Sequence, residues 1–223
     1  MIVYIGLMFR GIKLVIYDLD GVLIDSNRAI LESFKLTMAE VGAEFKPDMI
    51  LDRIGHSLYQ IFLDTMPEEF HDRLEELRQV YIKHFQSLDI KYTRLLPEVA
   101  ETLQEVKNMG FLQSVATNKT VTEAERILDE LGVGGYFDLM AGFMTVDKPK
   151  PEPDMIIYSL EKLGVEPFEA VFVDDTKVGL TAGIRAGVHT IGITTGNNTP
   201  EQIQSVNPST IIHRMSELPQ ILE

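Results

Sequence analysis

The sequence of 223 residues contains no cysteine, which excludes disulfides, thiolate nucleophiles and sulfur-ligated metal sites. Basic residues are also scarce: 20 lysines and arginines stand against 34 aspartates and glutamates, a formal net charge of −14. This charge repels a phosphate backbone at long range and no basic run offsets it, so we expect no nucleic-acid partner. A small anionic substrate fits only where a metal ion and local cations reverse the field.

A targeting segment is not evident either. The apolar stretch at residues 1–9 lacks a preceding basic region and a small-residue cleavage site, so we predict no signal peptide, no membrane span and a cytoplasmic protein. Met8 is an alternative start, which would leave residues 1–7 as a loose tail or a short edge strand. The length and the 45% hydrophobic content suffice for a full core, with room for one domain and a second inserted into it.

From residue 98 onward, apolar strand patterns alternate with helical ones. The periodicity predicts strands at 12–17, 112–117, 137–141, 170–174, 190–193 and 209–213, and helices at 98–109, 121–131, 154–163 and 179–186. Continuous apolar strands between amphipathic helices are typical of a parallel sheet that is covered on both faces. We therefore predict an α/β fold with a doubly wound parallel sheet.

The segment between Asp25 and Pro97 has a different pattern. Its apolar residues recur at helical spacing, and no strand pattern is evident. We predict an all-helical insert, a cap domain at residues 23–94 joined through hinges near 22–26 and 92–97. The catalytic core would then comprise residues 1–22 and 95–223.

Two carboxylates and a glycine follow the first predicted strand, as Asp18, Asp20 and Gly21. Because side chains alternate along a strand, Asp18 and Asp20 can point the same way, toward the edge where open α/β sheets bind ligands. One carboxylate can attack a substrate while the other transfers protons. The alternative is a polar strand exit that leads only into a turn.

Two further polar pairs end predicted strands. Thr117 and Asn118 suit phosphate binding near a helix amino end, although the same residues also suit turns and caps. Asp174 and Asp175 would repel each other unless a cation lies between them, and magnesium prefers such oxygen ligands.

In this order, Asp18-Leu19-Asp20-Gly21-Val22, Thr117-Asn118, Lys150 and Asp174-Asp175 resemble the four motifs of the haloacid dehalogenase superfamily of phosphotransferases. Residues 12–25 and about 95–215 resemble its Rossmann-like core. The insert resembles the small cap of the phosphoglycolate phosphatase and β-phosphoglucomutase branches. Two lysines fit the third motif, and the family's spacing to Gly164 and Asp175 favours Lys150 over Lys148, which would then lie in a solvated loop.

The resemblance implies a set of roles. It assigns catalysis to Asp18, Asp20 and Lys150, phosphate binding to Gly21, Thr117 and Asn118, and Mg²⁺ binding to Asp18, the backbone carbonyl of Asp20, Asp174 and Asp175. In it, Asp18 forms an aspartyl-phosphate and Asp20 transfers protons. Many relatives have glycine before the metal-binding aspartate and a further aspartate four residues after it. Here Asp174 and Gly179 occupy those positions, as in the mutase and sugar-phosphatase variant.

We therefore predict a magnesium-dependent phosphatase acting on a small phosphorylated metabolite, most similar to phosphoglycolate phosphatase. Pyrophosphatase and sugar-phosphate phosphatase or phosphomutase are the alternatives; the mutase reading is weakened because Ile30 occupies the position of the cap-hinge histidine in β-phosphoglucomutases. Arg53 and His56 are candidates to pair with a substrate carboxylate, although Ser57 as a helix cap explains the same segment.

An alternative of another class is a non-catalytic protein that binds a phosphate ligand. The intact motifs argue against it, because decay usually begins with the nucleophile. An apolar cap surface would equally suit a homodimer.

Overall fold

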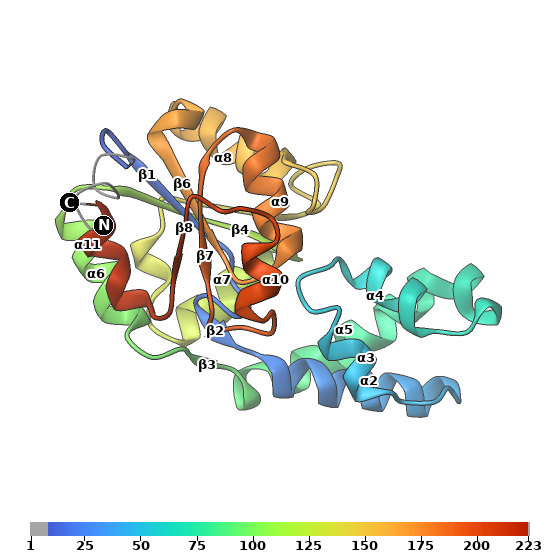
Figure 1. Ribbon diagram of the computed structural model, residues 1–223. Coiled ribbons are helices and arrows are strands. Elements are labelled where there is room, and N and C mark those ends of the chain that lie inside the picture. The colour runs from blue at the N-terminus through green and yellow to red at the C-terminus, as the bar shows by residue number, and fades with distance from the viewer. Residues whose placement is uncertain (1–8, 223) are drawn as a thin grey trace.

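The computed structural model describes residues 9–222, and at its centre is a six-stranded parallel sheet (Figure 1). The strand order is β5-β4-β1-β6-β7-β8. The strands are β1 (Leu14–Tyr17), β4 (Leu112–Thr120), β5 (Leu139–Phe143), β6 (Ala170–Asp174), β7 (His189–Ile193) and β8 (Thr210–Ile212). Because β1 pairs with both β4 and β6, the residues that follow it lie at the middle of one sheet edge. The expectation for residues 1–7 falls outside the described residues.

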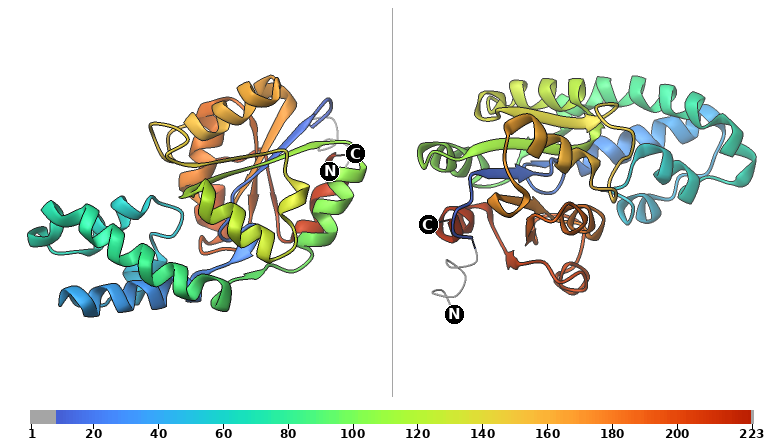
Figure 2. Two further views of the ribbon diagram at one scale, coloured as in Figure 1. Left: turned by 180° about the vertical axis from the view of Figure 1, so that it is seen from behind. Right: turned by 90° about the horizontal axis from the view of Figure 1, so that it is seen from above.

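Helices cover both faces of this sheet (Figure 2). Val15 and Tyr17 pack in a cluster with apolar side chains of α6, α7 and α11, whereas Leu14 and Ile16 pack with those of α8 and α9. The predicted doubly wound α/β fold is therefore confirmed. The helices of this part are α6 (Val99–Asn108), α7 (Val121–Glu130), α8 (Asp154–Leu163), α9 (Lys177–Ala186), α10 (Pro200–Gln204) and α11 (Leu218–Leu222), with 3₁₀ turns at Gly134–Tyr136, Pro167–Glu169 and Met215–Glu217.

The insert between β1 and β4 is helical and projects to one side of the sheet (Figure 1). It contains α2 (Asn27–Val41), α3 (Pro47–Leu51), α4 (Leu58–Thr65), a 3₁₀ helix (Glu68–Arg73) and α5 (Leu74–Tyr92). An aromatic cluster joins its helices: the ring of Phe34 lies 5.3 Å from that of Phe62 and 4.7 Å from that of Tyr81. The insert thus has a small apolar core of its own.

The chain enters and leaves this insert through a short antiparallel ribbon, β2 (Ile24–Asp25) and β3 (Arg94–Leu95). Both strands lie where hinges were predicted, although the sequence indicated no strand there. Two-residue strands are too short to produce a periodic pattern. The assignment of residues 23–94 as a separate domain stays a prediction.

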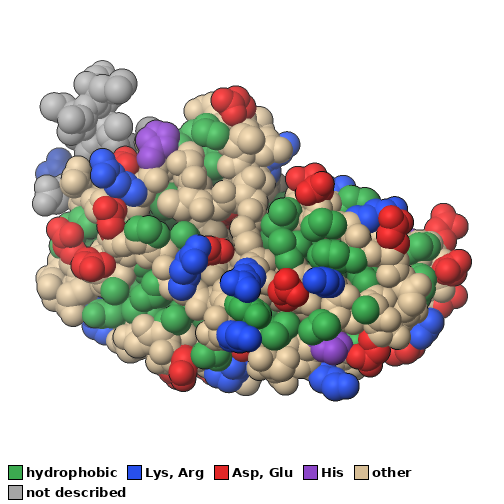
Figure 3. Space-filling model, turned by 90° about the horizontal axis from the view of Figure 1, so that it is seen from below, with side chains coloured by type: hydrophobic (Ala, Val, Ile, Leu, Met, Phe, Trp, Pro, Cys, Tyr) green, Lys and Arg blue, Asp and Glu red, His purple; other side chains and the backbone are tan. Residues whose placement is uncertain are grey.

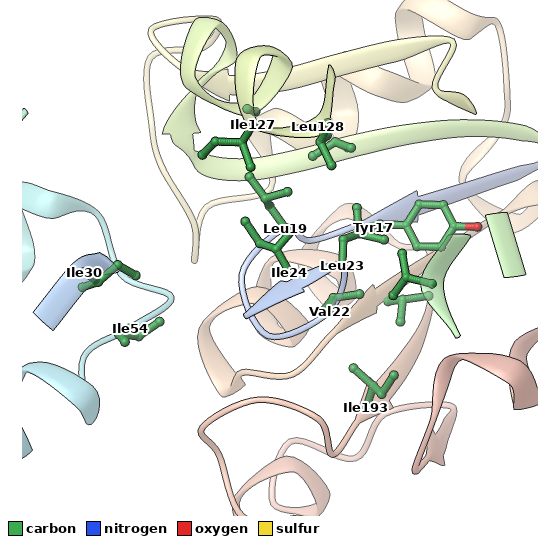
Figure 4. Close-up of a cluster of buried hydrophobic side chains, with 14 of the residues drawn as sticks. Tyr17, Leu19, Val22, Leu23, Ile24, Ile30, Ile54, Ile127, Leu128 and Ile193 are labelled. Atoms are coloured by element: carbon green, nitrogen blue, oxygen red, sulfur yellow. The ribbon is translucent and has the colours of Figure 1, made fainter. Parts of the chain in front are cut away.

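Apolar side chains fix the loop that follows β1 (Figure 4). Leu19, Val22 and Leu23 are fully buried, with Leu19 directed toward Ile127 of α7 and Val22 toward Ile193 of β7. The loop closes on itself through hydrogen bonds such as the one from the Leu23 N–H to the Leu19 carbonyl, 2.9 Å. This packing holds the two acidic residues of the loop in place.

Charge is unevenly distributed over the surface. On the face seen from below, basic side chains lie mostly around the middle, whereas acidic ones are frequent toward both ends (Figure 3). The net charge of −14 therefore does not describe the field at every part of the surface. None of the helices in residues 9–222 has the length and apolar character that a membrane-spanning helix needs.

Candidate active site

Three charged side chains from distant parts of the sequence meet at the carboxyl edge of the sheet. Asp18 follows β1, Asp174 ends β6, and Lys150 lies in the loop between β5 and α8. Lys150 Nζ lies 2.6 Å from Asp18 Oδ1 and 3.0 Å from Asp174 Oδ2, and all three side chains are buried. Of the two candidate lysines, the structure places Lys150 in this cluster, whereas Lys148 is exposed.

Burial and mutual repulsion set the charge states of this cluster. Burial raises the pKa of Asp18 to about 7; Lys150 opposes this increase, and Asp174 adds to it. Burial alone would lower the pKa of Lys150, but the carboxylates of Asp174 and Asp18 raise it above its ordinary value. The ammonium group therefore stays charged and favours the ionised form of Asp18.

Asp175 adds a third buried carboxylate at the same edge. Its Oδ2 accepts a hydrogen bond from the Asn197 N–H at 3.1 Å, while its Oδ1 is buried with no hydrogen-bond partner among residues 9–222. Burial, followed by repulsion from Asp174 and Asp18, raises its pKa well above the ordinary range. A buried carboxylate oxygen in this state needs a cation or a proton.

The Asp175 carboxylate lies close to two other carboxylates and to two glycines. One oxygen from each of Asp18, Asp174 and Asp175 lies within 4.8 Å of the others. A Cβ at Gly21 would lie 2.5 Å from Asp175 Oδ2, and one at Gly196 only 1.7 Å from it. Three hard oxygen donors fit the preference of Mg²⁺, and a side chain at either glycine would displace one of the three carboxylates.

Asp20 faces a different set of partners. Its Oδ2 accepts a hydrogen bond from Lys119 Nζ at 2.6 Å, and its Oδ1 accepts one from the Ser26 hydroxyl. The Asp20 carboxylate does not belong to the group formed by Asp18, Asp174 and Asp175. The metal contact expected from the Asp20 backbone carbonyl stays a prediction. Sequence reasoning missed Lys119; the signal that could have found it is its position directly after Thr117 and Asn118.

The expectation that Thr117 ends its strand just before a helix is wrong. Strand β4 continues to Thr120, where it pairs with Phe143 after a register shift. Helix α7 starts after Thr120, and its first turn is capped by the reciprocal hydrogen bonds of Thr120 and Glu123. Thr117 is nevertheless buried and lines the same cleft as Asp18, so its hydroxyl lies at the candidate site.

Asn118 joins three segments rather than offering a free side chain for phosphate. Its Nδ2 donates to the Gly55 carbonyl at 2.8 Å, and its Oδ1 accepts from the Lys150 N–H at 3.0 Å. The amide is therefore engaged in holding the Lys150 loop and the insert loop against the core. The phosphate contact expected of Asn118, through its backbone N–H, stays a prediction.

A cleft lies between the insert and this edge of the sheet, with Asp18 and Asp20 among its lining residues. His56 also lines it, and burial lowers the pKa of this imidazole. Arg53 does not line it, because its Nε bonds Asp64 Oδ2 at 2.7 Å. The structure therefore brings only one of the two predicted specificity residues to the cleft.

Two other expectations concern the same region. Ser57 caps helix α4 by accepting a hydrogen bond from the Gln60 N–H, so the capping interpretation of this segment holds. Ile30, at the position where a mutase would carry histidine, lines the cleft. Arg78 is a further cationic lining residue that sequence reasoning missed.

Known proteins resemble this chain in sequence and in fold. A family model described as haloacid dehalogenase-like hydrolase matches residues 15–193. The phosphoglycolate phosphatase of Aquifex aeolicus is 36% identical over 179 residues, covering 80% of this chain and 83% of that protein. The pyrophosphatase PpaX of Bacillus velezensis is 29% identical over 210 residues, covering 94% and 95%. A crystal structure described as a predicted phosphoglycolate phosphatase from Haemophilus somnus has a TM-score of 0.87 at 25% identity and covers 96% of this chain and 99% of its own.

Proposed function

The chain belongs to the haloacid dehalogenase-like hydrolases and is a hydrolase of phosphate esters, and we propose that it is a magnesium-dependent phosphatase with Asp18 as its nucleophile. The observation that carries this proposal is the buried contact of Lys150 Nζ with Asp18 at 2.6 Å and with Asp174 at 3.0 Å. A buried ion pair is weak evidence of a stabilising role, because apolar residues of similar size often stabilise a folded protein equally well. At a ligand-binding edge of the sheet, it supports a catalytic role.

The reaction proceeds in two displacements. Asp18 attacks phosphorus, the bond from phosphorus to the leaving oxygen breaks, and Asp20 donates a proton to that oxygen. Water then attacks the phosphorus of the aspartyl-phosphate while Asp20 accepts its proton, releasing phosphate and free Asp18. The Lys150 ammonium offsets the negative charge that gathers as phosphoryl oxygens approach Asp18.

A magnesium site formed by Asp18, Asp174 and Asp175 is supported by the buried, unpartnered Asp175 Oδ1. Bound Mg²⁺ would neutralise these carboxylates and polarise the phosphoryl group. We add the backbone carbonyl of Asp20 as a further ligand. Gly21 and Thr117 lie where phosphate oxygens would be held, because Gly21 borders the Asp175 carboxylate and Thr117 lines the cleft.

We propose that residues 23–94 act as a cap that excludes water during the reaction. Two contacts support a closed position: the Asn118 amide bonds the Gly55 carbonyl at 2.8 Å, and the Arg126 guanidinium pairs with the buried Asp89 carboxylate. The first joins a cap loop to β4, and the second joins α5 to α7.

Phosphoglycolate and pyrophosphate are the first substrates to test, because relatives named for these activities are 36% and 29% identical. Arg53 gives less support to carboxylate recognition, since it pairs with Asp64 and does not line the cleft. His56 remains the candidate from the predicted pair.

The proposal is tested by phosphate release from phosphoglycolate, pyrophosphate, hexose phosphates and p-nitrophenyl phosphate, each with and without Mg²⁺. We expect Mg²⁺-dependent release that Asp18→Asn abolishes. Lys150→Ala should lower kcat severely, whereas the matched Lys148→Ala should not. Retained turnover in Asp18→Asn would remove Asp18 as nucleophile, and phosphate binding without release would favour the non-catalytic alternative.

A further inference from the structure

We propose that the substrate's leaving group is long and largely apolar and carries an anionic group at its far end, which Arg78 binds. This inference rests on the proposed phosphatase function and narrows it to a substrate class. It is carried by the shape and composition of the cleft beyond the reacting groups.

Apolar side chains form a continuous part of the cleft wall, although Tyr59, Thr120 and Glu123 also line the cleft. This part of the wall is built by Leu58 and Ile61 of α4, by Tyr81, Ile82 and Phe85 of α5, and by Phe143 of β5. An ester with a two-carbon leaving group would leave this wall in water. Each methylene group that the wall instead buries is worth about fourfold in binding.

Helix α5 provides a length scale for this wall. Lys119 Nζ lies 5.2 Å from the Phe85 ring and 2.6 Å from Asp20 Oδ2, so Phe85 marks the end where protons are transferred. Arg78 lies seven residues earlier on the same helix, which is ~10 Å along its axis, and helical side chains lean further toward the amino end. Tyr81 and Ile82 fill the interval. The leaving group therefore has about two helical turns of apolar surface to cover before it reaches Arg78.

Arg78 is suited to bind an anion at that distance. Its side chain is only 15% exposed, and its guanidinium lies 5.6 Å from the centre of the Phe143 ring. Nη1 donates to Glu75 Oε1 at 3.1 Å, and no other hydrogen bond of this guanidinium is formed with residues 9–222. Glu75 itself is largely exposed and is shared with Tyr59 and Gln79. Lys119 is paired with Asp20 at the reacting end, whereas the partner of Arg78 is an exposed glutamate, so Arg78 is the cation that a distal carboxylate or phosphate can engage.

The test uses two series of synthetic esters with Mg²⁺ present. In the first, a carboxylate and the phosphate are separated by roughly one to eight methylenes, a span that brackets the ~10 Å from Phe85 to Arg78. In the second, simple alkyl phosphates of the same lengths lack the carboxylate. We expect kcat/KM to rise about fourfold per methylene in both series. At the longest spacers, we expect about a tenfold preference for the carboxylate series.

Two matched variants test whether Arg78 causes the preference for the carboxylate series. Arg78→Gln should abolish the preference for carboxylate at long spacers. Arg73→Gln should retain it, because Arg73 also pairs with a glutamate three residues away, Glu76, but is exposed and does not line the cleft. Loss of the preference in both variants, or in neither, would overturn the role of Arg78.

The remaining outcomes separate this inference from the function on which it rests. Turnover that is best with phosphoglycolate and falls as the spacer lengthens would overturn the apolar leaving group and leave the phosphatase intact. Absence of turnover with every ester, including p-nitrophenyl phosphate, would overturn the proposed function and this inference with it.

Discussion

Replacement of Lys150 by alanine should destabilise the metal-free protein, and the penalty should grow with pH. The ammonium lies 2.6 Å from Asp18 and 3.0 Å from Asp174, and all three groups are buried. Removing one partner of a buried ion pair costs about 3–5 kcal/mol in unfolding free energy, and we expect this range at pH 8.5.

The pH dependence follows from Asp18. Its pKa of about 7 in the folded protein lies above its ordinary 3.8, so the folded state binds this proton more tightly than the unfolded state. Wild-type stability therefore falls as pH rises from about 4 to about 7 and then levels off for this group. Without Lys150 the pKa of Asp18 rises further, so the variant continues to lose stability above pH 7. At pH 5.5, where Asp18 is mostly protonated, the penalty should be at least ~1 kcal/mol smaller.

The assay is urea unfolding with a metal chelator present, at pH 5.5 and pH 8.5, for wild type, Lys150→Ala and Lys148→Ala. Lys148 is exposed, so its variant should stay within about 0.5 kcal/mol of wild type at both pH values. A penalty for Lys150→Ala that does not change with pH, or an equal penalty for Lys148→Ala, would refute the electrostatic reasoning.

Three further perturbations test other parts of the site. Asp89→Asn should lower the unfolding free energy by about 2 kcal/mol and speed hydrogen exchange in α5, because it weakens the pair of buried Asp89 with Arg126, which is 40% exposed. Hydrogen exchange unchanged from wild type would show that this pair does not hold the cap. Gly21→Ala should weaken Mg²⁺ binding in calorimetry, since its Cβ would lie 2.5 Å from the Asp175 carboxylate at a backbone φ of 79°; unaltered affinity would move the ion elsewhere. Mg²⁺ affinity should rise with pH as Asp18, with its pKa of about 7, and Asp175, whose pKa is also raised by burial, lose their protons; a pH-independent affinity would exclude both carboxylates as ligands.

The sequence was informative wherever a local pattern determines the structure. The apolar segment at β6 followed by two aspartates indicates both a buried strand and its polar end, and the structure has that strand at Ala170–Asp174. The spacing of the lysine motif likewise favoured Lys150, which is the lysine that reaches Asp18. Short elements such as β2 and β3 were missed because two paired residues have no period to detect.

The remaining parts of the site depend on tertiary contacts that local patterns do not record. Lys119 bonds Asp20 across 99 residues of sequence, and its position after Thr117 and Asn118 indicates nearness to the site but not this partner. The side-chain amide of Asn118 bonds the Gly55 carbonyl and the Lys150 N–H, two partners that the sequence around Asn118 does not indicate. Only the folded arrangement of cap and core determines which polar side chains remain available to a ligand.

The most direct test of the central claim is to detect phosphate on Asp18. Wild-type enzyme is mixed with Mg²⁺ and a substrate that it hydrolyses, quenched with acid during turnover, and its peptides are analysed by mass spectrometry, with Asp18→Asn as the control. We predict one phosphoryl group on the peptide that carries Asp18 in the wild type and none in the variant. Full turnover with no phosphorylated carboxylate in rapid-quench samples, or a phosphoryl group on another residue, would contradict the proposed mechanism.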